Sequence, residues 1–207
     1  GIGEIGLDPT YVKNKDDDKR QVQVFESLLS SAEKLHKPVS IHSRKSLDDI
    51  FEIMTSYNAK NALLHWFDGS KKQLQKAMDL DFFVSFGPVM IYANDKQTLL
   101  SKADPSKILV ETDGPVRFSR CFEMKSAQIS FIPSVIFCAS KILEKTLFQP
   151  YPNTSKTYGD WFLQTSGLNT SIDSSDPVQI SVSSANTRRR DSVIAAIHKY
   201  LSAGYLE

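Results

Sequence analysis

The sequence predicts an α/β fold built on a parallel sheet. Two observations carry this prediction: short continuous apolar runs alternate with segments of helical periodicity, and four of these runs have a carboxylate or an imidazole at or near their ends. Continuous apolar runs are typical of strands buried on both faces, and strands that alternate with helices form parallel sheets. We therefore expect repeated strand–helix units over roughly the first 149 residues.

Five strands are expected in this part of the chain. Their apolar runs lie at residues 2–7, 39–42, 62–66, 82–86 and 108–111. The intervening segments are long enough to return the chain to the same end of the sheet, as a parallel arrangement requires.

Between the strands, apolar residues recur at the spacing of an amphipathic helix. An apolar stretch at residues 131–147 predicts a further helix, entered through Pro133. The periodic positions are Val22, Phe25, Leu28, Leu29, Ala32 and Leu35 in the first helix, Leu47, Ile50, Phe51 and Met54 in the second, and Leu74, Ala77 and Met78 in the third.

Units of this size indicate a (β/α) barrel of the TIM type, but the chain is too short for a complete one. Eight strand–helix units usually take about 250 residues, and the chain has 207. Because Gly1 leads directly into a strand, we expect an incomplete barrel that lacks its first strands.

The composition changes near Pro150, so we expect a partial barrel at residues 1–149 and an extension at residues 150–207. Residues 151–190 are rich in Ser, Thr, Asn, Asp, Gly and Pro, which is typical of a loop or linker. An amphipathic helix is predicted at residues 192–201. It is too short to be stable alone in water, so we expect it to cover the incomplete barrel or a second copy of the chain.

Charge and hydropathy exclude several classes of protein. The chain carries 25 basic and 24 acidic residues, a net charge of +1, so no global field attracts nucleic acid. No apolar run approaches the roughly 18 residues that span a bilayer, and we expect no membrane association. Cys121 and Cys138 lack zinc-site spacing, and two buried thiols fit a cytoplasmic location.

Four residues near the ends of the predicted strands form a candidate divalent metal site: Glu4, His42, His65 and Asp113. Carboxylate oxygens and imidazole nitrogens are ligands that Mg²⁺, Mn²⁺ or Zn²⁺ accepts. The carboxyl ends of parallel barrel strands meet at one face, so distant residues converge there. Each residue also has a simpler explanation: a structural charge for Glu4, a hydrogen-bonded core side chain for either histidine, and a turn cap before Pro115 for Asp113.

The motifs that carry these residues resemble those of the TatD-type metal-dependent deoxyribonucleases, a branch of the amidohydrolase-like barrels. In chain order they are GEIGLD, an Arg-Gln pair followed by Phe25, PVSIHSR, LLHWFDG, VSFGP and LVETDGP, within about residues 1–147. Several motifs in one order at compatible spacing are more specific than any one of them.

The resemblance implies a site for up to two metal ions and DNA as the substrate. Glu4 would bridge both ions, His42 and His65 would hold one, and Asp113 would hold the other and orient or deprotonate the attacking water. The family opens with a His-x-His pair on its first strand, but the chain's four histidines, His36, His42, His65 and His198, include no such pair. We therefore expect weak metal binding and poor DNA cleavage by this chain.

Other residues near the site fit substrate contacts. Arg44 suits a bidentate contact with phosphate, with a salt bridge to an acidic neighbour as the alternative. Trp66, with Phe67, suits stacking on a base, with packing under a loop as the alternative. Asp8 suits a contact with metal-bound water or a turn beside Pro9.

A further cluster and one histidine are expected to have no role in the site. The aspartates at residues 16–18 predict a helix start or a solvated loop, because consecutive side chains do not converge on an ion. His36 is expected to face solvent.

Two alternatives to a deoxyribonuclease stay open: a degenerate barrel that binds metal or a partner without catalysis, and a hydrolase of a small amide or ester.

Overall fold

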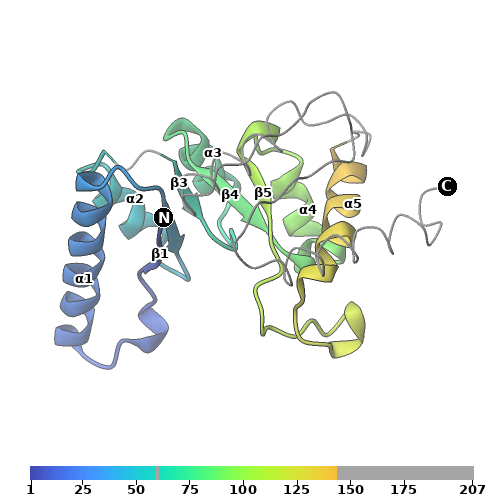
Figure 1. The fold of residues 1–207 in the computed structure, drawn as a ribbon, viewed down its shortest axis with the longest axis horizontal. Helices are drawn as coiled ribbons and strands as arrows, with labels where there is room; N and C mark the ends of the chain where they lie inside the picture. Colours follow the sequence, from blue (N-terminus) through green and yellow to red (C-terminus); the bar gives the residue numbers. More distant parts are fainter. Residues whose placement is uncertain (59–60, 144–207) are drawn as a thin grey trace, which may run out of the picture. The chain divides into compact units, whose positions relative to one another are not determined.

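The computed structural model describes residues 1–58 and 61–143. Its centre is a five-stranded sheet, in which every neighbouring pair of strands is parallel (Figure 1). The strands follow one another in chain order, β1 (Ile2–Gly6), β2 (Val39–His42), β3 (Ala62–Leu64), β4 (Phe83–Phe86) and β5 (Ile108–Val110).

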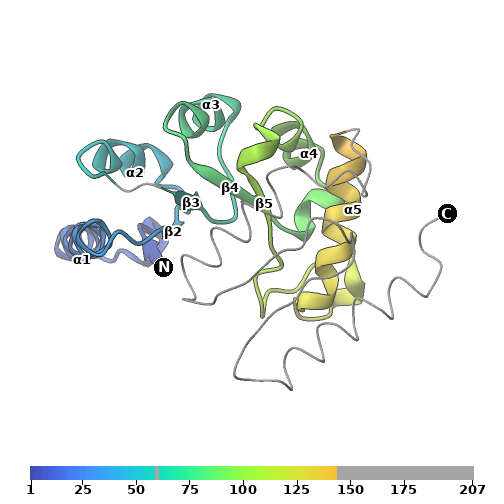
Figure 2. The same ribbon diagram turned by 45° about the horizontal axis from the view of Figure 1, so that its top comes forward.

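The helices follow the strands along one side of the curved sheet (Figure 2). They are α1 (Lys15–Lys34), α2 (Leu47–Met54), α3 (Lys71–Asp79), α4 (Asn94–Leu100) and α5 (Ile132–Ile142). A sheet in strict chain order, with its crossover helices on one face, has the arrangement of a (β/α) barrel and not of a doubly wound sheet. The predicted α/β fold with a parallel sheet is confirmed.

The hydrophobic core lies between the sheet and these helices. Ile41, Leu64 and Val84 are fully buried on neighbouring strands, against Leu29 of α1 and Phe51 of α2. The opposite side of the sheet carries a smaller buried cluster of Leu63, Phe83 and Leu109. Strands buried on both faces explain why the apolar runs of the sequence are continuous.

Some elements differ from the expectation. The strands β1, β3 and β5 end one or two residues earlier than predicted, and Leu35 ends α1 with 61% of its surface exposed. The helix α4 was not predicted, because it has only seven residues and buries an adjacent pair, Leu99 and Leu100, in place of a periodic stripe. The helix after Pro133 is confirmed as α5.

Between these elements, the described part of the chain also contains short turns of 3-10 helix. They are η1 (Pro9–Tyr11), η2 (Pro88–Ile91), η3 (Pro105–Lys107), η4 (Phe122–Met124) and η5 (Ile129–Phe131). The segment between β5 and α5 folds back on itself through an antiparallel bridge between Arg117 and Ser126.

The predicted extension at residues 150–207, including the helix expected at residues 192–201, lies outside the described residues, as does the end of the helix predicted at residues 131–147. These parts stay predictions. Of the helices that the structure describes, none has the length and apolar character needed to cross a membrane.

Candidate functional site

Glu4 reaches the site through an irregularity in β1. Between Ile2 and Ile5, β1 advances three residues while its neighbour β2 advances two, from Val39 to Ile41. The extra residue shifts the pairing at this point, and such irregularities re-aim a side chain. Glu4 therefore lies within β1 and not at its end, where the apolar pattern had suggested it.

His42 is the last residue of β2, as predicted, and Gly6 of β1 is its partner across the pair. The backbone at Gly6 has a φ of +147°, and a Cβ built there would lie 2.0 Å from the carbonyl oxygen of His42. Only glycine accepts both conditions. The contact brings β1 close to the carbonyl of His42, whose side chain belongs to the site.

His65 and Asp113 are carried by loops just beyond two strand ends. His65 directly follows β3, and its backbone N–H donates to the carbonyl of Ile41 in β2. Asp113 lies three residues after β5 in a left-handed conformation with a φ of 51°. Its carbonyl accepts a hydrogen bond from the N–H of Val116, so the expected turn role of Asp113 is present beside its role in the site.

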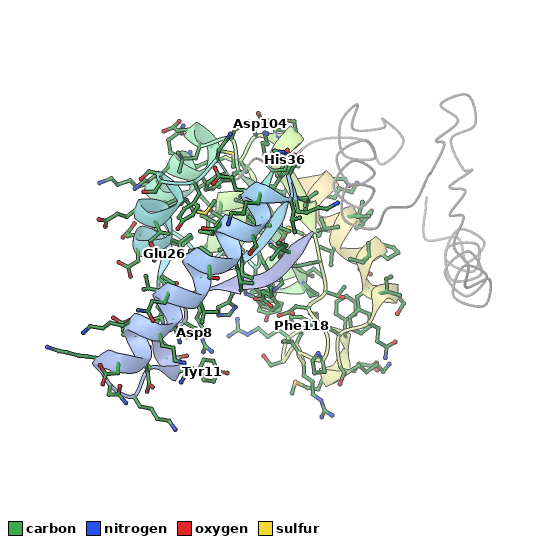
Figure 3. The ribbon with its side chains drawn as sticks, turned by 60° about the vertical axis from the view of Figure 1, so that its left-hand side comes forward. Asp8, Tyr11, Glu26, His36, Asp104 and Phe118 are labelled. Carbon is green, nitrogen blue, oxygen red and sulfur yellow. The ribbon has the colours of Figure 1, made fainter. Side chains whose placement is uncertain are left out.

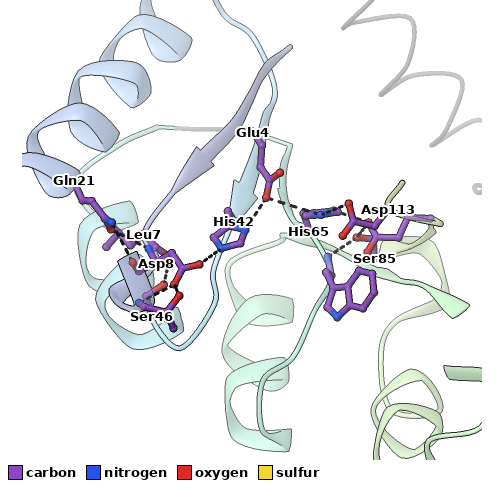
Figure 4. Close-up of polar contacts among 12 residues, drawn as sticks. Glu4, Leu7, Asp8, Gln21, His42, Ser46, His65, Ser85 and Asp113 are labelled. Atoms are coloured by element: carbon purple, nitrogen blue, oxygen red, sulfur yellow. Dashed lines mark hydrogen bonds and ion pairs between the residues drawn. The ribbon is translucent and has the colours of Figure 1, made fainter. Parts of the chain in front are cut away.

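The four predicted residues converge (Figure 4). Glu4 Oε1 lies 2.7 Å from His42 Nδ1 and 3.9 Å from His65 Nε2. Asp113 Oδ1 lies 3.7 Å from the same His65 nitrogen. Four side chains from distant parts of the sequence thus share one cluster.

Each imidazole is also held through its second nitrogen. His42 Nε2 lies 3.0 Å from Asp8 Oδ2, and His65 Nδ1 lies 2.6 Å from Glu111 Oε2. Hydrogen bonds of this kind orient the imidazoles of metal sites. The nitrogens that face Glu4 and Asp113 are therefore the ones left for a ligand.

Burial, hydrogen bonds and neighbouring charges shift three pKa values at the site. Burial lowers the pKa of His65, but the hydrogen bond and charge of Glu111, followed by the charges of Glu4 and Asp113, outweigh it and raise the pKa above its ordinary value. Burial raises the pKa of Asp113, and the charges of Glu111 and Glu4 add to this against the opposing effect of His65. Burial raises the pKa of Asp8, but hydrogen bonds from Thr10 and His42 leave it lowered overall.

The donor set fits a divalent cation in its chemistry. Glu4 lies beside one nitrogen of each imidazole and Asp113 lies beside His65, and a neutral imidazole cannot donate to Glu4 and Asp8 at once. A cation between His42 Nδ1 and Glu4 would satisfy both lone pairs. In the structure, Glu4 pairs directly with His42. In this arrangement, the described part of the chain contains no group of three His, Cys, Asp or Glu side chains that could hold an ion without rearrangement.

The residues predicted to contact substrate lie beside this cluster. Arg44 is exposed, two residues after His42, and forms no salt bridge with any described acidic side chain, so the alternative of a local salt bridge is not realised. Trp66 follows His65, and its ring stacks on Phe118 with centroids 5.9 Å apart. The alternative, that Trp66 packs against another part of the chain, is therefore realised. The backbone at Trp66 has a φ of 46°, in the left-handed region.

The structural readings of Asp8, of the aspartates at residues 16–18 and of His36 are confirmed, whereas the expectation of two buried thiols is not. Asp8 caps η1 beside Pro9. The aspartates at residues 16–18 lie in the first turn of α1, just after its N-cap residue Asn14. His36 is exposed, at the far end of α1 from Asp8 (Figure 3). Cys121 and Cys138 are unpaired, and both are half-buried instead of fully buried.

Sequence reasoning missed Glu111, Ser85 and Gln21. Glu111 holds His65, Ser85 donates to Glu111 Oε2 at 2.7 Å, and Gln21 exchanges two hydrogen bonds with the backbone of Asp8. Glu111 directly follows β5 at the same edge as the predicted ligands, which was a usable signal. Ser85 lies inside an apolar run and gave none.

Comparison with known proteins gives a consistent picture. A family model described as TatD related DNase matches residues 1–150. A protein from Bacillus subtilis named as an uncharacterized metal-dependent hydrolase, YabD, is 28% identical over 149 residues, covering 70% of this chain and 58% of that protein. The human protein named deoxyribonuclease TATDN3 is 31% identical over 116 residues, covering 55% of this chain and 42% of that protein. The chain thus spans about half the length of these relatives.

Two solved structures share the fold. The crystal structure of YJJV, a TatD homologue from Escherichia coli, matches with a TM-score of 0.62 at 21% identity, over 79% of this chain and 61% of that one. A TatD family hydrolase from Entamoeba histolytica matches with a TM-score of 0.66 at 18% identity, over 77% of this chain and 62% of that one.

Proposed function

Because this chain belongs to the family of TatD-related DNases, we propose that it acts as a metal-dependent hydrolase of phosphodiester bonds in DNA. The observation that carries the proposal is the convergence of Glu4, His42, His65 and Asp113 at one cluster. The names of the relatives, metal-dependent hydrolase and deoxyribonuclease, support a divalent metal and a DNA substrate.

Glu4, His42 and His65 would hold one ion, and Asp113 with Glu4 a second and weaker position. Mg²⁺, Mn²⁺ and Zn²⁺ all suit this mixture of oxygen and nitrogen ligands. A bound ion lowers the pKa of water and stabilises negative charge on phosphate oxygens. Asp113 would orient the attacking water and accept its proton, since its Oδ1 faces the cluster from the loop after β5.

Arg44 and Trp66 would bind the DNA. The exposed guanidinium of Arg44 can pair with two phosphate oxygens without first breaking a salt bridge to a described residue. Trp66 is held by Phe118, so its indole forms a fixed surface on which a base can stack.

A second function, binding of metal or of a partner without catalysis, is favoured by two observations. The chain has no His-x-His pair among its four histidines. The described residues contain no ready-made three-ligand group. Both observations predict weak binding of a second ion, which a two-metal reaction needs.

The experiment that tests the proposal measures cleavage of a labelled single-stranded oligonucleotide by the 207-residue chain with Mn²⁺, at high protein concentration because slow turnover is expected. Cleavage should need the metal and fall at least about 100-fold in Glu4→Gln, since that residue contacts the reacting centre. Glu52→Gln, an exposed carboxylate on α2, is the matched control and should leave cleavage unchanged.

The outcomes separate the two functions. Metal binding that Glu4→Gln abolishes, without DNA cleavage, supports the non-catalytic protein. Hydrolysis of a chromogenic ester in place of DNA contradicts the choice of phosphodiester substrate. Cleavage that survives in Glu4→Gln contradicts this site altogether.

A further inference from the structure

Asp8 is a rigidly placed carboxylate behind His42. It is only 7% exposed, and its Oδ1 accepts hydrogen bonds from the N–H and the hydroxyl of Thr10. Its backbone N–H donates to Gln21 Oε1 at 2.9 Å, and Gln21 Nε2 donates to its carbonyl at 3.0 Å. Four contacts from the same chain therefore fix the direction of Oδ2, which faces His42 Nε2.

Glu111 takes the same place behind His65. Its Oε2 lies 2.6 Å from His65 Nδ1 and accepts the hydroxyl proton of Ser85 at 2.7 Å. The direction of that hydroxyl is set, because Ser85 Oγ already accepts the N–H of Trp66 at 3.0 Å. Its side chain is 14% exposed, so little water competes for these contacts.

The chemistry of imidazole turns these contacts into a choice of tautomer. A neutral imidazole has one N–H donor and one lone-pair acceptor, and a carboxylate only accepts. His65 must then carry its proton on Nδ1 toward Glu111, because its Nε2 lies 3.7 Å from Asp113 and 3.9 Å from Glu4, beyond hydrogen-bond distance. His42 has a carboxylate at each nitrogen, Glu4 at 2.7 Å and Asp8 at 3.0 Å. Its one proton goes to Nε2, because the Asp8 side chain is fixed and 8% exposed whereas the Glu4 side chain is 44% exposed and can turn toward solvent. The lone pairs that remain, on His42 Nδ1 and His65 Nε2, both face Glu4 (Figure 4).

We propose that Asp8 and Glu111 are positioning residues that select opposite tautomers for the two site imidazoles, Nε2–H in His42 and Nδ1–H in His65. Both carboxylates act through the imidazoles and not on substrate. The value of this selection for metal binding rests on the proposed function, but the tautomers themselves do not.

The first measurement is a two-bond ¹H–¹⁵N correlation spectrum of the imidazoles in the metal-free 207-residue chain at about pH 8. It distinguishes the two neutral tautomers and the imidazolium. We expect the Nε2–H pattern for His42 and the Nδ1–H pattern for His65. The reverse assignment, or an imidazolium at His42 with both nitrogens protonated, overturns the proposal.

Asp8→Asn gives the sharpest test. The two donors of Thr10 keep the amide oxygen of Asn at the Oδ1 position, so the amide NH₂ replaces Oδ2 and faces His42. An NH₂ group donates, so the proton of His42 should move to Nδ1, while His65 keeps its pattern and reports on the fold. An unchanged His42 tautomer in this variant overturns the role of Asp8.

Glu111 needs a different pair of variants, because both of its contacts use one oxygen. Glu111→Gln can keep an amide oxygen at the Oε2 position and should preserve the Nδ1–H pattern of His65. Glu111→Leu removes the acceptor and should leave His65 in a mixture of tautomers with His42 unchanged. A pure Nδ1–H pattern in Glu111→Leu overturns the role of Glu111.

Asp104→Asn is the matched control, since Asp104 caps η3 as Asp8 caps η1. Asp104 Oδ1 accepts hydrogen bonds of 2.8 Å from the N–H and the hydroxyl of Ser106, far from Asp8 (Figure 3). This variant loses the same charge from the same kind of cap, and we expect both imidazole patterns to stay unchanged. A shifted His42 pattern here would assign the effect to general charge loss and overturn the proposal.

Calorimetric titration with Mn²⁺ is the second measurement. Loss of the group behind a metal-binding histidine typically weakens affinity about 10- to 100-fold. We expect a loss of that size in Asp8→Asn and Glu111→Leu and none in Asp104→Asn. If the unmodified chain binds no Mn²⁺, the proposed function fails while the tautomers still decide this inference. If a variant changes the tautomer of its imidazole but binds Mn²⁺ with unchanged affinity, the proposed link between tautomer and metal binding is wrong.

Discussion

At the scale of single residues, the site depends on how closely β1 approaches β2. A Cβ added at Gly3 would lie 2.7 Å from the Cβ of Ser40, and one added at Gly6 would lie 2.0 Å from the carbonyl oxygen of His42. Glu4 lies between these glycines and pairs with His42 at 2.7 Å. The glycines therefore set the backbone spacing that the Glu4–His42 contact needs.

Gly6→Ala should destabilise the chain by roughly 2 kcal/mol or more, because the new methyl group meets backbone atoms that cannot rotate away and because alanine is strained at a φ of +147°. Urea unfolding followed by circular dichroism measures this. Gly87→Ala is the control: its added Cβ would be 3.6 Å or more from its neighbours, so a change below about 0.5 kcal/mol is expected. Equal losses in the two variants would contradict the argument.

The candidate ligands were predictable because each sits on or just after an apolar run. His42, His65 and Asp113 follow the ends of β2, β3 and β5 or close them, and parallel strands bring such positions together. The contacts behind them were not predictable. The pairing of Glu111 with His65 depends on the register of β3, β4 and β5, and nothing in the sequence indicates that the bulge turns Glu4 toward His42.

At the scale of elements, the strands were easier to predict than the helices. A strand buried on both faces gives a continuous apolar run, as in β4, where all four residues are buried. The short helix α4 instead shows an adjacent apolar pair that fits no helical period. It packs against η2 and α5, so tertiary contacts and not periodicity define it.

The packing of α5 on η2 predicts slow thiol chemistry. Cys138 of α5 lies with its Sγ 3.8 Å from the carbonyl oxygen of Met90, and burial raises the pKa of the Cys138 thiol above its ordinary value. Burial likewise raises the pKa of Cys121, whose Sγ lies 3.9 Å from the carbonyl of Pro88. Because the thiolate is the reactive form, both cysteines should react with iodoacetamide several-fold more slowly than glutathione at pH 8.

Mass spectrometry over time measures this alkylation. The rate should rise with pH, since the thiolate fraction grows, and urea should bring both cysteines to the rate of glutathione. Alkylation of Cys138 in the folded chain as fast as glutathione at pH 8 would show that α5 does not stay packed on η2.

At the scale of the whole molecule, the strict chain order of the sheet is what creates the site. Each strand lies beside the next, so every loop after a strand opens at the same edge. Glu4 and Asp113 therefore both lie beside His65, although β1 and β5 are the edge strands of the described sheet. The repeated strand–helix pattern predicted this order. Composition alone could not predict this order, because it says nothing about which strands are neighbours.

A metal that binds this cluster should stabilise the folded chain, because the cluster exists only when distant strands are assembled. A ligand that binds only the folded state adds about 2.7 kcal/mol at a hundredfold excess over its dissociation constant, which raises the melting temperature by several degrees. Mn²⁺ should therefore raise the melting temperature of the 207-residue chain, and a chelator should reverse the rise.

The ligands are tested with variants. Each variant is compared with and without Mn²⁺, so that changes in its own stability cancel. His65→Ala should lose most of the rise, since it removes the nitrogen that faces both Glu4 and Asp113. His36→Ala, which removes an exposed imidazole just after the C-terminal end of α1, should keep the rise in melting temperature. An equal rise in the two variants would place the ion outside this cluster.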